Sequence, residues 1–530
     1  MAQQELDGEE QVGSKSIVPG SLLAVGVSAL ILVGASLPTF AQKSKDTLRV
    51  ALVDPVSTPV LYEDPKPETG FLSSAAFDSL LCFDEKHGEI RPHLATSWKM
   101  VDERTLEMTL RKDVKFHDGV PFSADDAVYT LNWQIDPKSK YRFASNMSWL
   151  ERAEKIDDHR LRVIAKYPNP LMLLRLAVGA PILPAKLHAS FTEAGEFGRR
   201  KPVGTGPYRV VSIDSANGAV LELNREYRHG SDCKPAGSIG RMHAIPMPDM
   251  QTQVAQLMTG GVDLLHVAER DQVEMLQRDP RVAVTATQAI TFHYLTMDAA
   301  GRSGNKALQD VRVRRAIVQA LDRELITRSV VPGGNEARPW DMFCFPIQKG
   351  CAGSVKPYPH DIDAARKLLA EAGYANGFDV EISATPGSHD LATAIAGGLR
   401  RVGVRTTVAR LTFGAYRANQ VAGKLQMLVG QWTSGGFPDV ASTADFYFSG
   451  GPRDYWRDEE LTKLEKEGLV TVDETKRREI YGRMFDKANR LAYVLPFSTK
   501  PDVFVHTKDI EIDKGSLNTY GADLFGMRWK

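Results

Sequence analysis

The stretch RTLEMTLRKDVKFHDGVPFSADDAV, residues 104–128, contains the signals that decide the fold of this chain. Apolar residues at positions 106, 108 and 110 alternate with polar residues at 105, 107 and 109. This alternation predicts a half-buried β-strand with one face in water. A Gly/Pro turn follows, and Ser123 then predicts the N-terminal cap of a helix. Asp125 and Asp126 stand in the first turn of that helix, where its dipole favours negative charge.

Helical and strand patterns alternate along the rest of the chain, which predicts an α/β fold. Residues 47–53 predict a first strand, and residues 71–83 carry apolar residues at helical spacing. Residues 310–321 predict a helix with one buried face. A strand at 378–384, a helix at 391–401 and a strand at 404–411 predict a β-α-β unit with a parallel pair of strands.

The first 45 residues indicate an exported protein. Residues 17–37 are almost wholly apolar or small, Lys15 precedes them, and Thr39-Phe40-Ala41 places small residues where a signal peptidase requires them. We therefore expect a cleavable signal peptide over residues 1–41 and a periplasmic protein. A retained membrane anchor is the alternative, because the run is about as long as a short membrane span. No cysteine stands near the cleavage point, so a lipid anchor is not expected.

The composition is that of a globular protein. Of 530 residues, 43% are hydrophobic and 25% are charged, with 66 basic and 66 acidic side chains. The leader contains four of the acids and one lysine, so the remainder has a net charge of +3. This small charge gives no indication of a nucleic-acid partner. A chain of this length exceeds what one core holds, so two or three domains are expected.

The four cysteines are an even number in an exported chain, which permits disulfides. Cys344 and Cys351 enclose a short loop rich in turn-forming residues, so we predict a bridge between them. Cys82 and Cys233 are only the remaining pair, and their pairing stays open. No Cys-x-x-Cys spacing or histidine cluster lies beside these residues, so no metal site is predicted.

Several short clusters contain residue types used in catalysis, but each has a simpler structural explanation. His117-Asp118-Gly119 lies in the turn described above, and Asp157-Asp158-His159 separates two alternating segments, as a hairpin connection does. Ser388-His389-Asp390 cannot form a catalytic triad, because adjacent residues do not reach that geometry, and caps the next helix more simply. Gly204-Thr205-Gly206 leads into a strand, unlike a phosphate-binding loop. We predict no catalytic residue and no cofactor.

The segment GQWTSGGFPDV, residues 430–440, directly follows the apolar run Met427-Leu428-Val429. A large aromatic side chain, small hydroxylated residues and two glycines then precede a Pro-Asp turn. This pattern predicts a strand that ends in a loop whose main chain approaches a ligand. An ordinary surface turn is the alternative.

Long parts of the chain resemble the bacterial extracellular solute-binding proteins of family 5, the dipeptide- and oligopeptide-binding components of ABC importers. The resemblance extends over essentially the whole chain after the leader. It is carried by Ala95-Thr96-Ser97-Trp98, by residues 111–128, and by segments in the same order at 181–184, 202–208, 224–227, 260–263, 310–322 and 358–373.

The resemblance implies a two-lobed periplasmic-binding-protein fold of type II, cluster C, with an extra subdomain in the first lobe. The implied division is lobe I at 45–82, 202–289 and 497–530, the extra subdomain at 83–201, and lobe II at 290–496. The chain would cross between the lobes near 291–294 and 495–497. Closure of the lobes around a solute would be the mechanism.

The function implied by the resemblance is transport and not catalysis. A monomeric protein of this family captures a peptide or peptide-like solute and delivers it to the permease subunits of a membrane importer. A periplasmic sensor or chaperone derived from the same fold is the alternative from another functional class.

The resemblance places the ligand loop at Trp432, Thr433, Ser434 and Gly435. Peptide-binding relatives carry an aspartate three residues after the tryptophan, which pairs with the free α-ammonium of the peptide, and this chain has Gly435 there. Asp439 either replaces that aspartate or only fixes the turn. Loss of one partner from such a buried pair costs about 3 to 5 kcal/mol. The alternative is therefore a non-peptide solute, such as an opine-like conjugate, a glycoside or a chelated metal.

Three further aromatic residues are candidate ligand contacts. His293 and Tyr294 lie at the first expected crossing, where side chains face the cleft, and buried packing at the hinge is the alternative. Trp340 follows a Gly-Gly pair and a proline, and either stacks on a ligand ring or covers a loop.

Overall fold

The computed structural model describes residues 46–64, 66–139, 147–266, 270–352, 358–433, 437–513 and 523–530. These residues belong to one compact unit, 43–530. The expected signal peptide at 1–41 lies outside the described residues. Within the described ranges, no helix combines the length and the apolar character needed to cross a bilayer.

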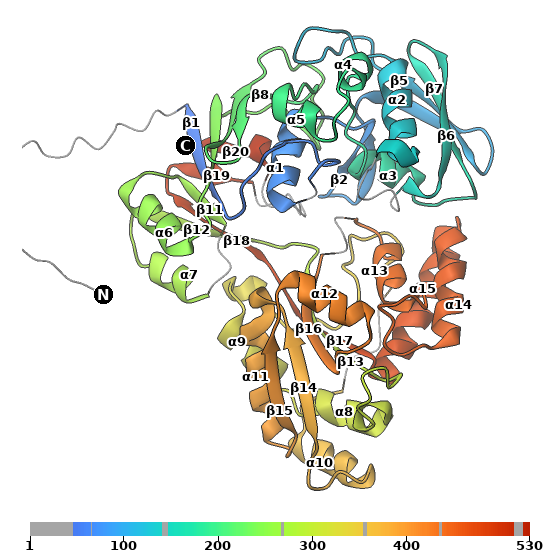
Figure 1. The fold of residues 1–530 in the computed structure, drawn as a ribbon, viewed down its shortest axis with the longest axis vertical. Coiled ribbons are helices and arrows are strands. Elements are labelled where there is room, and N and C mark those ends of the chain that lie inside the picture. The colour runs from blue at the N-terminus through green and yellow to red at the C-terminus, as the bar shows by residue number, and fades with distance from the viewer. Residues whose placement is uncertain are drawn as a thin grey trace, which may run out of the picture. The chain divides into compact units, whose positions relative to one another are not determined.

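The first sheet has seven strands from the beginning, the middle and the end of the chain (Figure 1). Its strands are β1 (Thr47–Leu52), β8 (Tyr208–Asp214), β9 (Gly218–Leu223), β10 (Arg241–Pro246), β11 (Leu264–His266), β12 (Val282–Thr287) and β18 (Asp502–Thr507). The strand order is β12-β18-β11-β1-β10-β9-β8, with β1 parallel to both β10 and β11. The first strand therefore lies where the sequence pattern predicted it, inside the sheet.

Three helices and a small strand pair accompany this sheet. They are α1 (Pro67–Ala76), α6 (Met250–Thr259), α7 (Arg270–Leu276), β19 (Ile510–Ile512) and β20 (Met527–Trp529), with a short 3-10 helix at Leu524–Gly526. We call this part of the molecule lobe I.

A four-stranded antiparallel sheet and its helices lie between β1 and β8 in the chain. The elements are β2 (Leu81–Asp84), β3 (Glu89–Pro92), β4 (Ala95–Met100), β5 (Thr105–Leu110), β6 (Leu150–Asp157), β7 (Arg160–Ala165), α2 (Ala124–Ile135), α3 (Met172–Val178), α4 (Ala185–Ala189), α5 (Glu196–Arg200) and a 3-10 turn at Pro137–Ser139. The sheet order is β4-β5-β7-β6, and β2 pairs separately with β3. The half-buried strand predicted around 106–110 is β5, whose apolar side chains are buried.

The predicted helix cap at Ser123 is confirmed. Helix α2 begins at Ala124, and the main-chain N–H of Ser123 donates to the Asp126 carboxylate at 2.9 Å. By contrast, the helical pattern over 71–83 is wrong beyond Ala76. Helix α1 ends there, and Leu81–Asp84 form β2, because pairing with β3 outweighs the local helical spacing.

The second sheet has five strands and lies in what we call lobe II. Its strands are β13 (Phe292–Met297), β14 (Asp379–Ala384), β15 (Arg405–Arg410), β16 (Met427–Trp432) and β17 (Val494–Thr499), in the order β15-β14-β16-β13-β17. The β-α-β prediction is confirmed, since β14 and β15 pair in parallel and α11 packs on both. Helices and 3-10 turns complete the lobe: Ala307–Gln309, α8 (Val311–Gln319), α9 (Arg323–Val330), Gly334–Glu336, α10 (Ile362–Glu371), Pro386–Ser388, α11 (His389–Arg400), α12 (Phe413–Val421), α13 (Ala441–Phe448), α14 (Glu459–Val470) and α15 (Glu474–Arg490).

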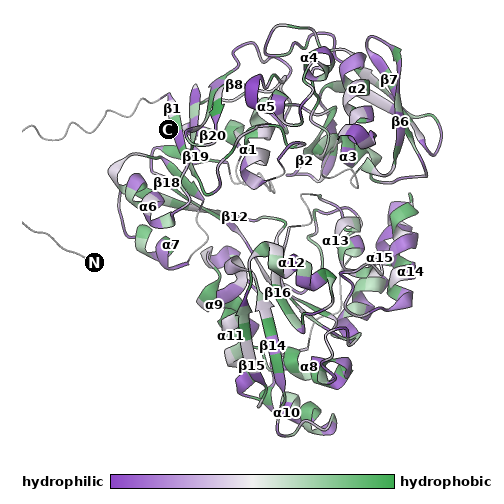
Figure 2. Cartoon of the chain, viewed as in Figure 1, coloured by the Kyte–Doolittle hydropathy of each residue, from purple (hydrophilic) through white to green (hydrophobic). Residues whose placement is uncertain are grey.

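Each face of the five-stranded sheet has its own core. Along β16, Leu428 and Trp432 belong to a largely aromatic cluster, whereas Met427 and Val429 belong to an aliphatic cluster on the other face. This follows from the two-residue period of a strand. Figure 2 shows the hydrophobic character of β16 between its covering helices. Trp432 therefore ends β16 on the aromatic face.

The chain passes between the two large sheets twice. Residues 288–291 connect β12 to β13, and residues 500–501 connect β17 to β18. Residues 497–499, expected in lobe I, lie within β17 of the lobe II sheet. In the division that we propose, the second change of lobe therefore follows Thr499.

Candidate ligand-binding site

Trp432 is held by the protein interior. Its side chain is 9% exposed, and its Nε1–H donates to Thr443 Oγ1 at 2.8 Å. Its ring lies 4.2 Å from Phe446 and 5.7 Å from Tyr447, measured between centroids. Trp432 thus fixes the point where β16 ends and the predicted ligand loop starts. Thr433 is half-buried, whereas Ser434, Gly435 and Gly436 lie outside the described residues, so their main-chain contacts with a ligand stay a prediction.

Asp439 is buried and bound to Arg477. The two carboxylate oxygens accept from the Arg477 guanidinium at 2.6 and 2.7 Å, and one of them also accepts from the main-chain N–H of Ala441. Burial alone would lower the pKa of Arg477, but Asp439 outweighs it and raises the pKa. The structure does not support a ligand contact by Asp439, because its acceptors are already occupied and it is 1% exposed. Of the two roles considered for it, fixing the turn fits this geometry.

His293 and Tyr294 lie on β13 and are both buried. His293 Nδ1 is 3.0 Å from Ser498 Oγ on β17, and burial, with the nearby Lys500 charge, lowers the pKa of its imidazole to about 3. The Tyr294 hydroxyl is 3.5 Å from that of Tyr416. In this structure both residues pack inside lobe II, as the hinge-packing alternative describes.

Trp340 stacks on Phe345, with ring centroids 4.6 Å apart. This contact joins Trp340 to the loop that Cys344 and Cys351 close by a disulfide, with Cα atoms 5.8 Å apart. One face of the Trp340 ring is therefore covered by Phe345 and cannot stack on a ligand. The loop-covering alternative therefore describes the position of Trp340 in the structure.

The disulfide loop supports the segment that follows the ligand loop. Lys349 donates its main-chain N–H to the Pro438 carbonyl, and Val440 donates to the Lys349 carbonyl, at 3.0 and 3.1 Å. The Gln348 side-chain amide donates to the Phe437 carbonyl at 3.3 Å. No local pattern predicts this pairing, because residues 348–349 and 437–440 are far apart in the chain.

A cavity of about 600 Å³ lies on lobe I, lined by α1, the β2–β3 hairpin, the end of α3 and the loop at 232–235. The many polar side chains at its wall include Asp84, His87, Arg91 and Lys234. His87 Nδ1 lies 2.7 Å from the Asp84 carboxylate. Burial alone would raise the pKa of Asp84, but hydrogen bonds from His87 outweigh it and lower the pKa.

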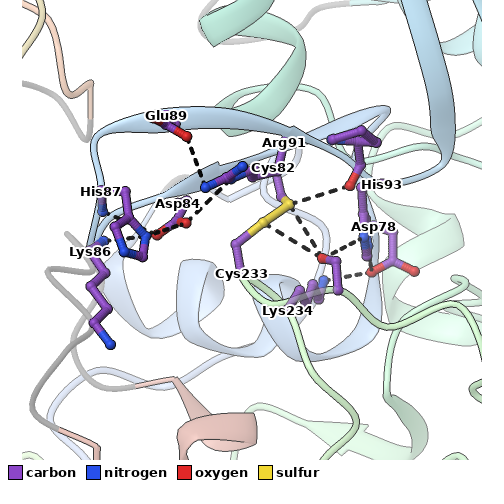
Figure 3. Close-up of a disulfide and its surroundings, with 12 residues drawn as sticks. Asp78, Cys82, Asp84, Lys86, His87, Glu89, Arg91, His93, Cys233 and Lys234 are labelled. Atoms are coloured by element: carbon purple, nitrogen blue, oxygen red, sulfur yellow. Dashed lines mark hydrogen bonds and ion pairs between the residues drawn. A yellow bond between two sulfur atoms is a disulfide. The ribbon is translucent and has the colours of Figure 1, made fainter.

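Asp78 forms a buried polar cluster beside this cavity (Figure 3). Its carboxylate lies 3.0 Å from His93 Nε2, 2.9 Å from His229 Nε2 and 2.8 Å from Lys234 Nζ, and accepts from Thr205 Oγ1 at 2.9 Å. Burial alone would raise the pKa of Asp78, but Lys234 and His93 outweigh it and hold the pKa well below its ordinary value.

Asp78, His93 and His229 have the residue types and the proximity of a metal site. The Lys234 ammonium, however, already bonds the Asp78 carboxylate, so the positive charge that a metal would supply is present. The neighbouring Cys82–Cys233 disulfide, with Cα atoms 6.3 Å apart, ties the Lys234 loop to β2 (Figure 3). The cluster is thus explained as a structural link between lobe I and its subdomain.

His117 and residues 157–159 have structural roles, whereas the expected helix cap by the Ser388 side chain is not formed, and Ser388 Oγ and His389 Nδ1 are buried without a hydrogen-bond partner among the described residues. His117 Nε2 is 2.9 Å from the Gly206 carbonyl, and its Nδ1 accepts from the main-chain N–H of Gly204. Residues 158–159 connect β6 to β7 as a hairpin, as predicted. These bonds hold turns in place and leave no arranged nucleophile and base at either position.

The two lobes meet beside the lobe I cavity. Arg175 on α3 lies over the Phe437 ring, with 5.1 Å from the guanidinium carbon to the ring centroid. Leu171 and Leu174 of α3 belong to the same hydrophobic cluster as Val440 of lobe II. The next residues of α3 line the cavity. The cavity and the segment after the ligand loop are therefore neighbours, joined through α3.

Comparison with known proteins identifies the same family that the sequence resembles. Residues 89–454 match the family described as bacterial extracellular solute-binding proteins, family 5 Middle. The heme-binding protein A of Haemophilus influenzae is 26% identical over 396 residues, 69% of this chain and 70% of that protein. The di/tripeptide-binding protein 2 of Pseudomonas aeruginosa is 25% identical over 489 residues, 86% of this chain and 89% of that protein.

A solved structure shares the fold. The periplasmic binding protein DppA from Helicobacter pylori, in complex with the peptide STSA, aligns with a TM-score of 0.74 at 21% identity, over 91% of this chain and 98% of that one. The α/β, two-lobed architecture is thus that of periplasmic binding proteins. Since the family match spans more than half of its residues, the chain belongs to the bacterial extracellular solute-binding proteins of family 5.

Proposed function

We propose that this protein captures a peptide or peptide-like solute between its lobes and delivers it to the permease subunits of an ABC importer. It acts in the periplasm as a monomer, after removal of residues 1–41, and carries out no chemistry on the solute. Membership of the solute-binding family supports this proposal, as do the relatives described as a di/tripeptide-binding protein and as a complex with the peptide STSA.

The observation that carries the proposal is the meeting of the lobes at α3. Arg175 and Phe437 come from different lobes and touch beside a cavity of about 600 Å³, a volume suited to a small solute. The two connections at 288–291 and 500–501 act as the hinge. Contacts made only when both lobes touch the solute supply the free energy of closure.

A second candidate is transport of a non-peptide solute. Gly435 occupies the position where peptide-binding relatives carry the amine-pairing aspartate, and Asp439, the nearest carboxylate after it, is bound to Arg477. A free α-ammonium then lacks its expected partner at this loop. The relative described as heme-binding protein A shows that proteins similar to this chain are not all described as peptide binders.

The identity of the solute is tested by purifying the protein from its native host and analysing the released small molecules by mass spectrometry. We expect one solute in near-stoichiometric amount, released on unfolding. A protein that carries no solute and binds no member of a peptide and conjugate library in calorimetric titration would overturn the transport proposal.

The amine position is tested with trialanine and N-acetyl-trialanine in calorimetric titrations. We expect trialanine to bind wild-type protein no more tightly than millimolar, and Gly435→Asp to strengthen its binding about 30-fold, because a desolvated charge pair contributes about 2 kcal/mol or more. N-acetyl-trialanine is the control, since it has no amine to gain from the new carboxylate. Micromolar binding of trialanine to wild-type protein contradicts the inference from Gly435.

A further inference from the structure

A second, smaller pocket lies in lobe I at the carboxyl ends of β1 and β11. Its volume is about 70 Å³, and its walls come from these strands, α1, β18 and β20. Most of the lining side chains belong to the buried hydrophobic core of the lobe: Val50, Leu52, Phe71, Leu264, Phe504 and Met527. A pocket of this size and character takes the end of one aliphatic arm, whereas a whole solute needs the larger cavity.

Glu68, in the first turn of α1, adds a carboxylate to this apolar wall. Its Oε2 atom is buried and has no hydrogen-bond partner within the described part of the chain. The charge of Lys66 acts on Glu68, but the Lys66 ammonium lies 3.6 Å from the Asp64 carboxylate. A buried carboxylate oxygen without a donor costs free energy, so this position calls for a donor from outside the chain.

The charge around Glu68 favours a positive group. Burial raises the pKa of the Glu68 carboxyl, main-chain N–H groups oppose that rise, and the Asp54 charge reinforces it. His266, the other polar side chain of the wall, lies 3.2 Å from Asp502 through its Nε2 atom. A cation in the pocket would supply the missing donor and offset the repulsion from Asp54, whereas an anion would add to that repulsion.

The pocket and the cavity of about 600 Å³ are neighbours along α1. Glu68 and Phe71 line the pocket, whereas Gly70 and Ser74 line the cavity. The segment 525–527 also contributes to both walls. Figure 1 shows α1 on the side of lobe I that faces lobe II. A solute held in the cavity can therefore extend one arm along α1 into the pocket.

The pocket also lies next to the hinge. Asp502, the partner of His266, is the first residue of β18 and directly follows the connection at 500–501. In α/β sheets, ligands bind beyond the carboxyl ends of parallel strands, at a point where the strand order reverses. Because β1 is parallel to β10 on one side and to β11 on the other, its carboxyl end is such a position. The place of the pocket in the fold thus agrees with ligand binding.

We propose that Glu68 binds a cationic group of the transported solute, an ammonium or a guanidinium at the end of an aliphatic arm. The apolar walls bury the methylene groups of the arm, and the Glu68 carboxylate accepts from the N–H donors at its end. This inference rests on the proposed capture of a solute between the lobes and specifies a positive group on that solute. It places the positive group in lobe I, away from position 435.

The test uses the mature protein purified from its native host, with the released solute identified by mass spectrometry. We expect a solute that carries an alkylamine or an alkylguanidine. In calorimetric titration of this solute into solute-free protein, Glu68→Gln is expected to bind about 30-fold more weakly than wild type, because a charge-assisted contact is lost. Glu103→Gln, in the exposed turn between β4 and β5, is the matched control and is expected to keep the wild-type affinity.

The stability of the solute-free variants separates ligand binding from a structural role of Glu68. Glutamine keeps an oxygen that accepts from the main chain and removes the buried charge, so we expect Glu68→Gln to unfold at the wild-type temperature or above it. Differential scanning calorimetry measures this. A lower unfolding temperature for Glu68→Gln than for Glu103→Gln would show that the carboxylate supports the fold and would overturn the inference.

The remaining outcomes separate this inference from the proposed function. A released solute without a positive group overturns the inference and leaves the transport function standing. Equal affinity of wild type and Glu68→Gln for a positively charged solute has the same meaning. If no solute is released and none of a peptide and conjugate library binds, the transport function fails, and this inference fails with it.

Discussion

The two lobes each hold a cluster of charged side chains, one buried and one near the surface. In lobe I, the Asp78 carboxylate is enclosed and bonded by Lys234, two histidines and Thr205. In lobe II, Arg417 and Arg453 are held against Phe446. The first cluster pairs its charges inside the protein, whereas Arg453 of the second is exposed to solvent and also interacts with the Asp445 carboxylate.

This difference shows that residue types alone do not identify a site. Asp78, His93 and His229 have the composition of a metal centre, yet their bonds are explained by a buried ion pair. Arg417 and Arg453 match no sequence motif, since they are far apart in the chain and meet only at the Phe446 ring. Residue types therefore indicate a ligand site only when the partners and the exposure of each side chain are known.

The largest expected effect comes from breaking the complete cluster. Asp78→Asn removes the anion that balances Lys234, so we expect the free energy of unfolding to fall by about 3 to 5 kcal/mol, the range for breaking a buried ion pair. Urea unfolding followed by circular dichroism at pH 7 measures this. Adding Lys234→Met to Asp78→Asn is expected to recover part of the loss, because no buried charge then stays unpaired.

Asp379→Asn is the matched control for the Asp78 variant. Asp379 pairs with Arg405 on the surface, where an ion pair contributes about 0 to 1 kcal/mol. If Asp78→Asn costs no more than Asp379→Asn, the interpretation of the Asp78 cluster as a structural link is wrong.

A second prediction compares two buried histidines, one in each lobe, that have different partners. His93 of lobe I faces Asp78, but His293 of lobe II faces Ser498, and burial lowers its pKa to about 3 from an ordinary 6.5. Between pH 3 and pH 6.5, His293 is therefore protonated in the unfolded chain and neutral in the folded chain. The stability contributed by neutral His293 is complete above pH 6.5 and is lost as pH falls toward 3, by about 1.4 kcal/mol per unit.

His293→Asn tests this dependence, because an amide keeps a polar partner for Ser498 without a titrating ring. Urea unfolding of both proteins at pH 6.5, 5.5 and 4.5 is expected to show a shallower loss of stability for the variant. His243→Asn, on the lobe I sheet, is the control and is expected to follow the wild-type slope. Parallel slopes for wild type and His293→Asn would refute the assignment.

The smallest effect is expected at Arg417, in the lobe II cluster. Arg417→Gln is predicted to leave the free energy of unfolding within about 0.5 kcal/mol of wild type, since relief of like-charge repulsion offsets lost packing on Phe446. Differential scanning calorimetry of the solute-free protein measures it. A loss comparable to that of Asp78→Asn would show that Arg417 has a structural role and would remove the contrast between the clusters.

Local signals predicted much of the fold. The alternation at 105–110, the cap at Ser123 and the β-α-β pattern at 378–411 all correspond to elements of the structure, because each depends on neighbouring residues. The helical spacing over 71–83 failed after Ala76, where β2 pairs with a strand whose position the pattern did not show. Strand pairing depends on residues elsewhere in the chain and overrides weak local preference.

Less of the candidate site was predictable. Trp432 was correctly placed at the end of a strand, but its burial against Phe446 and its bond to Thr443 follow from packing with α13. The sequence allows two roles for Asp439, and the structure favours the turn, because Arg477, 38 residues later, binds both carboxylate oxygens. Side-chain partners of this kind come from separate helices, so sequence spacing does not reveal them.

The α/β class, the order of most strands and helices, the family resemblance and the glycine at position 435 follow from the amino-acid sequence. The pairing of the charged groups follows from the folded arrangement. Asp78 is bonded by Lys234 and Asp439 by Arg477, whereas Arg417 and Arg453 lie on one aromatic ring. The physical reason is that pairing depends on distances of a few ångströms between segments far apart in the chain, which only folding brings together.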